Sequence, residues 1–279
     1  MTSPPAYKIL RSTGGHALLV ALSLIFALPF IWLVLSSLKP ASQIFEFPPS
    51  WIPRPIQWSN YPEALAFIPL IRYTGNTLFL ALSGTFGTVL SCSLVAYGLA
   101  VVRWRWANAL FFVMLTTVMI PPQVTTIPVF LIFKQLGWVG TFRPLVIPAF
   151  FANAFFVFLL RQFFKTIPRD LLDAARIDGC SHFEVYWRIV LRLSRPALVV
   201  VIFFTFTAYW NDFMGPLIYL NEDSSYTLSL GLQQFLCQHN AKWELLMAAS
   251  TLMILPVIIL FFILQRSFVE GINLTGLKG

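Results

Sequence analysis

Six long stretches of this chain carry no Asp, Glu, Lys or Arg, and this feature limits its possible folds more than any other. Each stretch is at or near the roughly 20 apolar residues that a helix needs to cross about 30 Å of hydrocarbon. So much apolar surface does not fit into one soluble core, and the sequence therefore predicts a membrane protein. The stretches are Ser12–Leu38, Tyr73–Val102, Trp106–Phe133, Pro144–Leu160, Pro196–Asn211 and Leu245–Gln265.

The composition agrees, with 58% hydrophobic and only 11% charged residues, whereas a soluble domain has about 25% charged residues. Because prolines interrupt the third stretch at Ile120–Gln123, we expect a helix before this break and a short interfacial helix after it. We predict an all-α integral membrane protein with a single transmembrane domain over residues 1–279. Its six spans are expected at about 15–38, 73–102, 107–122, 144–164, 195–218 and 244–265.

The distribution of basic residues predicts the orientation. With a cytoplasmic N-terminus the inner segments hold thirteen Lys and Arg residues and the outer segments six, which satisfies the positive-inside rule. Both termini are then cytoplasmic, together with a loop over residues 165–194. This topology accounts for the net charge of +8, so no nucleic-acid partner is expected. The short inner link Arg103–Trp106 is expected only to reverse the chain.

The loop over 165–194 has the pattern of two short helices. Pro168 can open the first helix, and Gly179 can end it because glycine adopts left-handed dihedrals at little cost. Ser181 starts a second helix with Glu184 three residues later, which is the capping-box spacing. The sequence therefore predicts a helix–glycine–helix hairpin on the cytoplasmic side.

Both predicted helices of the hairpin have an apolar side. In the first helix Asp173 and Arg176 also lie three residues apart on one face. Such a hairpin can dock on another protein, and it can also lie flat on the bilayer, anchored by its arginines. The apolar residues are Leu171, Leu172, Ala175 and Ile177 in the first helix, and Phe183, Tyr186, Trp187, Ile189 and Val190, which we expect to pack, in the second.

The hairpin sequence "DAARIDG", followed by nine residues and "IVL", resembles the EAA loop of ABC-importer permease subunits. Two departures from that pattern are visible. Asp173 replaces a glutamate, and Arg192 stands where the family has a proline, with Pro196 four residues later. The matching residues are Asp173, Ala174, Ala175, Gly179, Ile189 and Leu191.

Other stretches along the chain are similar to the maltose-type second permease of the carbohydrate-uptake branch. The resemblance implies a permease subunit, itself not an enzyme, of a binding-protein-dependent importer of sugars or oligosaccharides in the bacterial cytoplasmic (inner) membrane. The alternative substrate is a glycerol phosphate or a related polyol ester. The stretches are "SSLKP", "NYPEAL", "LLRQFF", "IPRDLLDAARIDG", "WNDF", "MAAS" and the terminal "LKG".

The resemblance also implies how the hairpin works. It would be the coupling helix, seated in a groove of an ATP-hydrolysing subunit, with Asp173 offering a carboxylate to a cationic side chain and Gly179 at the closest contact. The implied partners are a second, homologous permease subunit, two ATP-binding subunits, an extracytoplasmic solute-binding protein and membrane lipid. ATP and Mg²⁺ would be used by the partner subunits, with no cofactor bound by this chain. The coupling residues are Asp173, Ala174, Ala175, Asp178, Gly179, Ile189 and Leu191.

The C-terminal segment "GINLTGLKG" resembles the family's tail that reaches towards the ATPase interface, and its other interpretation is a frayed end.

A candidate substrate path follows from the fifth span. Asp212, in "YWNDFMGP", is the only acid close to the interior of a span, and ionisable groups there tend to be functional. Sugars are bound by aromatic faces and planar hydrogen-bonding side chains, but the same residues also fit a helix-end cap beside an interfacial Trp. The candidates are Tyr209, Trp210, Asn211 and Asp212, with Asn76, Thr77 and Asn153 on other spans.

Two other classes of protein are alternatives to the permease. A secondary transporter or channel would show a relay of buried charges or paired broken helices, and the sequence shows neither. A membrane enzyme would need clustered catalytic groups, but His16, His182 and His239 are far apart in the sequence. No glycine-rich phosphate loop with a following lysine occurs, so we expect no ATP site in the chain itself.

Overall fold

Helices form the whole framework of the protein. The computed structural model describes residues 5–236 and 241–276, with side chains for 15–236 and 241–266. Over these ranges no β-strand occurs. Four helical stretches of the described chain can cross a membrane by length and hydropathy, and two bent pairs of helices raise this number to six if each pair is one span. The predicted all-α membrane fold is therefore confirmed.

The chain divides into two compact units, which hold residues 1–69 with 232–254 and residues 70–231 with 255–279. The first unit contains a helix that is apolar all round, and its most apolar window has no buried residue. Such a helix is typical of one that faces lipid or another protein. The helices of this unit are α1 (Pro5–Ser37), α2 (Ala41–Ile44), α3 (Asn60–Phe67) and the first part of α15 (Trp243–Gly276).

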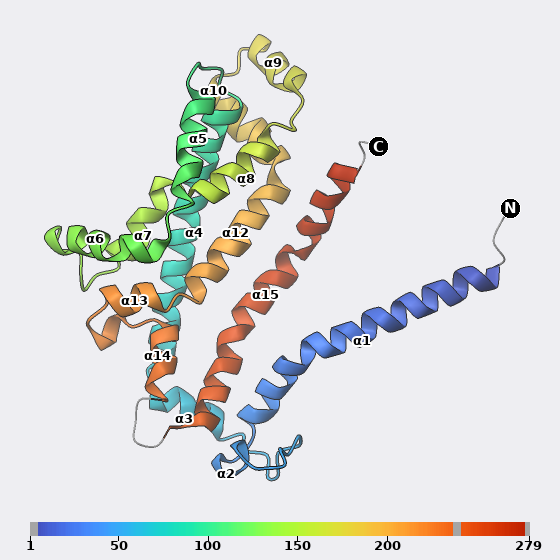
Figure 1. Cartoon of the computed structure of the whole chain (residues 1–279), viewed down its shortest axis with the longest axis vertical. Helices are drawn as coiled ribbons and strands as arrows, with labels where there is room; N and C mark the ends of the chain where they lie inside the picture. Colours follow the sequence, from blue (N-terminus) through green and yellow to red (C-terminus); the bar gives the residue numbers. More distant parts are fainter. Residues whose placement is uncertain (1–4, 237–240, 277–279) are drawn as a thin grey trace. The chain divides into compact units, whose positions relative to one another are not determined.

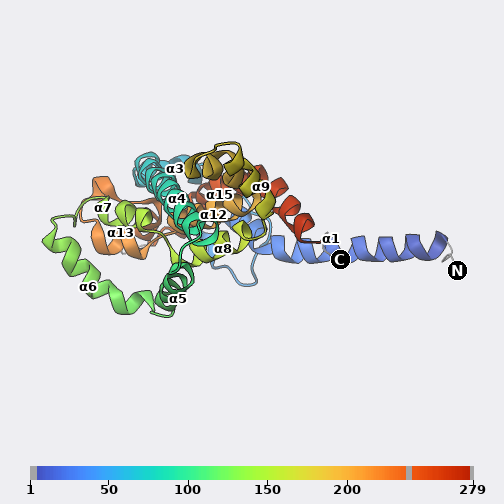
Figure 2. The ribbon, with the colours of Figure 1, turned by 90° about the horizontal axis from the view of Figure 1, so that it is seen from above.

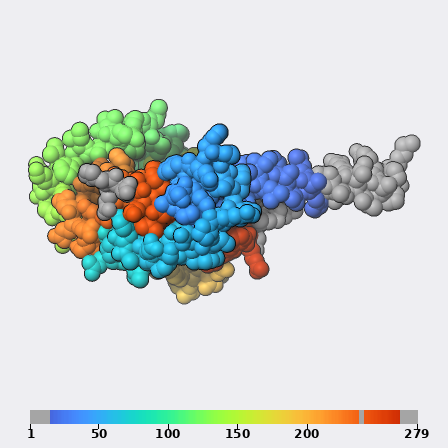
Figure 3. Space-filling model, turned by 90° about the horizontal axis from the view of Figure 1, so that it is seen from below, coloured from blue at the N-terminus to red at the C-terminus, as the bar shows by residue number. Residues whose placement is uncertain are grey.

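A buried asparagine fixes the segment that follows α1. Asn60 is 5% exposed, and its Nδ2 donates hydrogen bonds of 2.9 Å to the carbonyl groups of both Ser37 and Lys39. The ammonium of Lys39 lies 4.1 Å from the centroid of the Trp32 ring, where a cation is attracted to the aromatic face. Figure 3 shows the segment between α1 and α4, in blue, as a continuous packed surface.

The second unit is built around α4 (Leu70–Ala100). Figure 1 shows α9 and α10 at one end of α4 and α13 and α14 towards the other, and Figure 2 shows α6 at the edge of the unit, beyond α5 and α7. The other helices are α5 (Ala107–Thr117), α6 (Pro122–Gln135), α7 (Arg143–Val146), η1 (Ile147–Phe151), α8 (Ala154–Phe164), α9 (Arg169–Ile177), α10 (His182–Glu184), η2 (Val185–Val190), α11 (Leu191–Leu193), α12 (Arg195–Trp210), α13 (Met214–Tyr219), η3 (Asp223–Ser225) and α14 (Leu228–Gln234).

Small residues on α4 let its neighbours approach closely. The ring of Tyr209, on α12, occupies the space where a side chain on Gly84 would stand. The ring of Phe150, on η1, does the same at Gly87. Ser91 donates a hydrogen bond of 2.9 Å to the carbonyl of Ala149, so the contact includes the backbone. Close packing of this kind is how helices associate in membranes.

The break in the third apolar stretch is confirmed, but the helix before it is shorter than predicted. Helix α5 ends at Thr117, although the sequence predicts a helix over 107–122. Helix α6 then begins at Pro122 at an angle of 95° to α5. The turn at 118–121 uses the residues before the proline pair, because a residue that precedes proline avoids the helical region.

The predicted spans over 144–164 and 195–218 are each built from more than one helix. In the first, Ala152 has a positive φ of 61°, and Asn153 then caps α8. In the second, α12 ends at Trp210 and α13 begins at Met214. Continuous hydropathy did not reveal these breaks, because they depend on local polar contacts.

We expect Asn60→Ala to lower the free energy of unfolding by about 1–3 kcal/mol, because two buried carbonyl groups lose their donor. The measurement is the thermal unfolding midpoint of the purified chain in detergent, followed by intrinsic fluorescence. Asn211→Ala is the control, since Asn211 is exposed and donates only to Thr207 one turn earlier. Equal shifts in the two variants would contradict a special contribution of Asn60.

Candidate functional site

Helix α9 has one side in the core of the second unit and one side in the open. Leu172 and Ala175 are each 7% exposed and belong to the same apolar core as residues of α4. Leu171 is 49% exposed and Ile177 is 86% exposed, so the structure corrects the expectation that all four share one apolar side. The helix follows Pro168, as predicted. Ala174 and Asp178 are exposed.

Gly179 ends α9 in the predicted left-handed conformation, with a φ of 84°. Its N–H donates to the carbonyl of Arg176 at 3.1 Å, and the N–H of Cys180 donates to the carbonyl of Ala175 at 2.9 Å. These two bonds form a Schellman motif, which satisfies the last carbonyl groups of a helix. A side chain on Gly179 would meet no atom of this chain within 4 Å. The turn is therefore open to contact from outside.

The predicted capping box opens the second helix of the hairpin. Ser181 Oγ accepts a hydrogen bond of 3.3 Å from the Glu184 N–H, and the Glu184 carboxylate accepts one of 3.0 Å from the Ser181 N–H. Hydrogen bonds from the backbone and hydroxyl of Ser181, and the charge of Arg188, lower the pKa of Glu184. The carboxylate therefore stays ionised at neutral pH, and the turn between the two helices is well defined.

Hydrogen bonds and apolar contacts attach the second helix to α4. Tyr186 and Ser93 share a hydrogen bond of 2.7 Å between their hydroxyls, and Tyr97 donates to the carbonyl of His182 at 3.0 Å. Val185 and Val190 are fully buried in the same core. Residues Val185–Val190 form a π-helix, which the sequence pattern did not predict. Single π-turns inside helices occur frequently at functional sites.

Two aromatic residues that we expected to pack are exposed instead. Phe183 is 67% exposed and Trp187 is 59% exposed. Leu171, Ile177 and Gly179 are exposed as well, and we call these five exposed residues of the hairpin the hairpin face. Ile189 and Leu191 are half-buried and pack against the core behind it. A folded apolar surface of this kind is typical of a contact with another protein.

The hairpin leaves through a sharp bend. The helical segment His182–Leu193 meets α12 at 79°, with Ser194 between them. Pro196 lies in the first turn of α12, where its missing N–H costs no hydrogen bond. The turn therefore lies at Ser194, two residues after Arg192, which is exposed.

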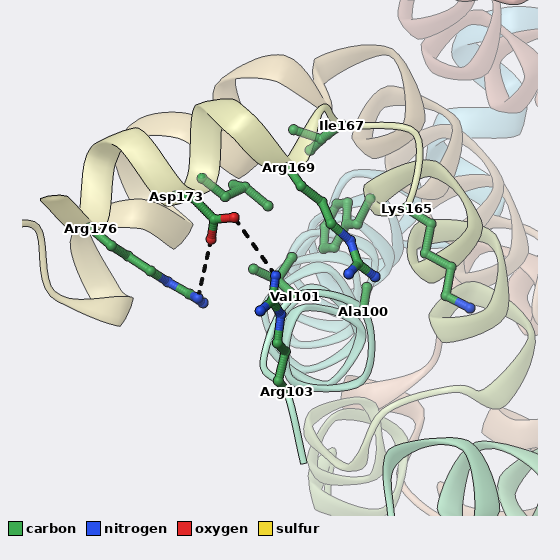
Figure 4. A pocket seen from close by; sticks show the side chains of 10 residues that line it. Ala100, Val101, Arg103, Lys165, Ile167, Arg169, Asp173 and Arg176 are labelled. Carbon is green, nitrogen blue, oxygen red and sulfur yellow. Dashed lines mark ion pairs between the residues drawn. The ribbon is translucent and has the colours of Figure 1, made fainter. Parts of the chain in front are cut away.

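Asp173 is half-exposed and has two cationic neighbours in its own chain. Its carboxylate lies 3.7 Å from the guanidinium of Arg103 and 3.7 Å from that of Arg176 (Figure 4). The pair with Arg176 follows the predicted spacing. Arg103 belongs to the short link after α4, which was expected only to reverse the chain, and no local sequence signal connects it with Asp173. This contact joins the link to the hairpin.

The candidate substrate-path residues separate into different environments. Trp210 is 1% exposed and stacks on Phe206, so it serves the core. Tyr209 packs on Gly84, and Asp212 accepts a hydrogen bond from the N–H of Gly215. Only Tyr209 and Asp212 of this group therefore combine partial burial with a polar end; Asn211 is exposed.

The substrate-path candidates on α4 and before α8 form hydrogen bonds with loops and with a helix start. Asn76 donates to the carbonyl groups of Ser224 and Tyr226, and Thr77 accepts from the N–H of Leu228. Asn153 caps α8, and its N–H contacts Cys92. Positions 76 and 92 are about 24 Å apart along α4 at 1.5 Å per residue. The structure therefore does not bring Asn76 and Asn153 together at one site.

Part of the sequence predictions lies outside the described residues. This holds for His239 and for positions 277–279, while the side chains of the tail segment are not described from residue 267 onward. The tail stays a prediction.

Known proteins resemble the chain over nearly its whole length. The arabinooligosaccharides transport system permease protein AraQ of Bacillus subtilis (strain 168) is 33% identical over 261 residues, which is 92% of each chain. The sn-glycerol-3-phosphate transport system permease protein UgpE of Yersinia enterocolitica is 29% identical over 265 residues, which cover 92% of this chain and 94% of UgpE.

A solved structure shows the same fold. It is the crystal structure of a bacterial ABC transporter involved in the import of the acidic polysaccharide alginate, and one of its chains matches with a TM-score of 0.81 and 22% identity. The match covers 96% of this chain and 99% of that chain.

A family model matches residues 92–273, a range that contains α8, the whole hairpin and α12. This match covers more than half of the chain, and the helical membrane architecture agrees with it. The chain belongs to the binding-protein-dependent transport system inner membrane component family, and it is a multi-pass permease of a transport complex with other subunits.

Proposed function

We propose that the chain is the permease subunit of an importer for sugars or oligosaccharides, powered by ATP hydrolysis in separate subunits. The similarity to AraQ over 92% of both chains carries this proposal. The helix–glycine–helix hairpin supports the coupling mechanism, because its turn is fixed in shape and open to contact. Transport would proceed by alternating access between inward-facing and outward-facing states.

Buried contacts and hydrogen bonds attach the hairpin to the bundle. Its buried residues share one core with α4 and α12, and Tyr97 and Tyr186 add hydrogen bonds at the same place. If the ATP-binding subunits bind the hairpin face with different affinities before and after hydrolysis, they shift the equilibrium between the inward-facing and outward-facing states of the permease. Coupling free energies between two sites are typically about 1–3 kcal/mol. Repeated ATP hydrolysis would drive the permease through successive cycles.

The proposal assigns the other tasks to partners. Two ATP-binding subunits use ATP and Mg²⁺, an extracytoplasmic protein delivers the solute, and a second, homologous permease completes the pathway. The apolar window of α1, which contains no buried residue, supports a contact with that permease or with lipid. Both termini and the hairpin are assigned to the cytoplasmic side, in agreement with the excess of basic residues there.

The substrate path is proposed to pass Tyr209 and Asp212. An aromatic ring beside a carboxylate offers a sugar both a stacking face and a hydrogen-bond acceptor. A glycerol phosphate is the second candidate substrate, because UgpE is also a full-length relative. Stimulation of ATP hydrolysis by the substrate-loaded binding protein, with an oligosaccharide or with sn-glycerol 3-phosphate, distinguishes the two.

We expect Gly179→Asn to abolish substrate-stimulated ATP hydrolysis in the assembled transporter while the chain still inserts and accumulates. Asparagine tolerates a positive φ, and the space around a Cβ at this position is open in the described structure, so we expect the side chain to obstruct a surface brought from outside. The measurement is ATPase activity of the purified complex in lipid, with and without loaded binding protein.

Gly137→Asn is the matched control. Gly137 also has a positive φ, of 66°, and open space around it, but it lies in the loop after α6. We expect this variant to behave like the unmodified chain. Full stimulation in the Gly179 variant would contradict docking at the hairpin turn.

We expect Asp173→Lys to reduce co-purification of the ATP-binding subunits, because it replaces a carboxylate at the hairpin with a cation. The change also breaks the two ion pairs within the chain, so the exchange Arg103→Asp with Asp173→Lys is the comparison. This double variant restores an internal pair of opposite charges and leaves the hairpin charge reversed. If this double variant restores co-purification, Asp173 acts through its contacts within the permease and not by binding the ATP-binding subunits.

A further inference from the structure

A cavity of about 250 Å³ lies between the end of α4, the end of α8 and the start of α9 (Figure 4). A second, more open cavity of about 520 Å³ adjoins it. The two share Ala100, Arg103, Lys165 and Arg169. All of these residues belong to the second compact unit, and because the two cavities share four lining residues we describe them together as the basic recess.

Positive charge dominates the basic recess. The first cavity is lined by four cationic side chains and by one carboxylate, that of Asp173. This carboxylate is already shared by Arg103 and Arg176. Within the part of the chain that the structure describes, neither Lys165 nor Arg169 forms an ion pair. In the described chain, therefore, no carboxylate lies within ion-pair distance of either cation.

The cations also repel one another. Lys165 is exposed, and partial desolvation, followed by the like charges of Arg161 and Arg169, lowers its pKa. Arg161 itself is occupied, since it donates to Asn108 at 2.7 Å and to the Leu99 carbonyl at 3.2 Å. It thus fixes the wall of the recess. An anion held beside Lys165 and Arg169 would relieve the repulsion.

The position of the recess favours a lipid over a soluble anion. The apolar helices α4 and α8 end here, so the recess lies where spans meet the headgroup layer. Its apolar lining includes Phe164, Ile167 and Leu172, each nearly or fully buried. Trp104 and Trp106 are exposed beside it, as aromatic residues at a membrane interface are. A recess with cations above an apolar lining suits an amphipathic molecule.

We infer that the basic recess binds the phosphate group of an anionic phospholipid, held by Lys165 and Arg169 between the link after α4 and the hairpin. Guanidinium and ammonium groups donate charge-assisted hydrogen bonds to phosphate oxygens, and basic pockets between spans on the cytoplasmic side bind anionic headgroups. The inference rests on the proposed membrane orientation. Because Arg103, which pairs with Asp173, lines the same recess, the bound lipid would lie against the hairpin.

The test is native mass spectrometry of the full chain, in the complex in which it is purified, titrated with phosphatidylglycerol or phosphatidylcholine. We expect tighter retention of phosphatidylglycerol. Lys165→Gln with Arg169→Gln should weaken it about fivefold for each cation removed. Arg188→Gln with Arg192→Gln is the matched control, because it removes two hairpin cations that line neither cavity, and should leave retention unchanged.

The conservative pair Lys165→Arg with Arg169→Lys keeps both charges and should keep the lipid, which separates charge from misfolding. Equal loss in the control variant would overturn the inference, since general surface charge would then explain it. Displacement of phosphatidylglycerol by millimolar inorganic phosphate would also overturn it, in favour of a soluble anion. If the variant with Lys165→Gln and Arg169→Gln loses the ATP-binding subunits but still retains phosphatidylglycerol, the inference is overturned, and the recess is a contact for those subunits. Failure of the Gly179 experiment alone would leave this inference standing.

Discussion

Close packing on α4 is the constraint on which the second compact unit depends. Glycine at positions 84 and 87 lets the rings of Tyr209 and Phe150 lie where side chains would otherwise stand. In lipid, apolar side chains gain little from leaving their surroundings, so helices are held together by close contact and hydrogen bonds. The hydrogen bond from Ser91 to the backbone of η1, and the pair of Ser93 with Tyr186, are contacts of this kind.

The features that the sequence predicts well are those with local causes. The charge-free stretches reflect the thickness of the bilayer, and the end of α9 at Gly179 reflects the conformational freedom of one residue. The capping box needs only Ser181 and Glu184 at the right spacing. Each of these signals lies within one segment of chain and requires no knowledge of distant contacts.

The features that the sequence does not predict depend on contacts between distant segments. Trp210 looks like a sugar-binding aromatic in its local sequence, but the structure buries it against Phe206. Asn76 and Asn153 look like polar groups of a pathway, yet each satisfies backbone groups of a loop or a helix start. The pair of Arg103 with Asp173 joins two loops seventy positions apart. Periodicity within a segment carries no information about such pairs.

The bend at Ser194 determines the direction in which the hairpin can act on the bundle. Because the hairpin's second helix meets α12 at 79°, the two axes are nearly perpendicular. If the hairpin's second helix moves along its own axis, it pushes the end of α12 sideways. Such a force would tilt α12 rather than shift it along its length. In the proposed coupling mechanism, a small movement of the hairpin would therefore become a rotation of a span.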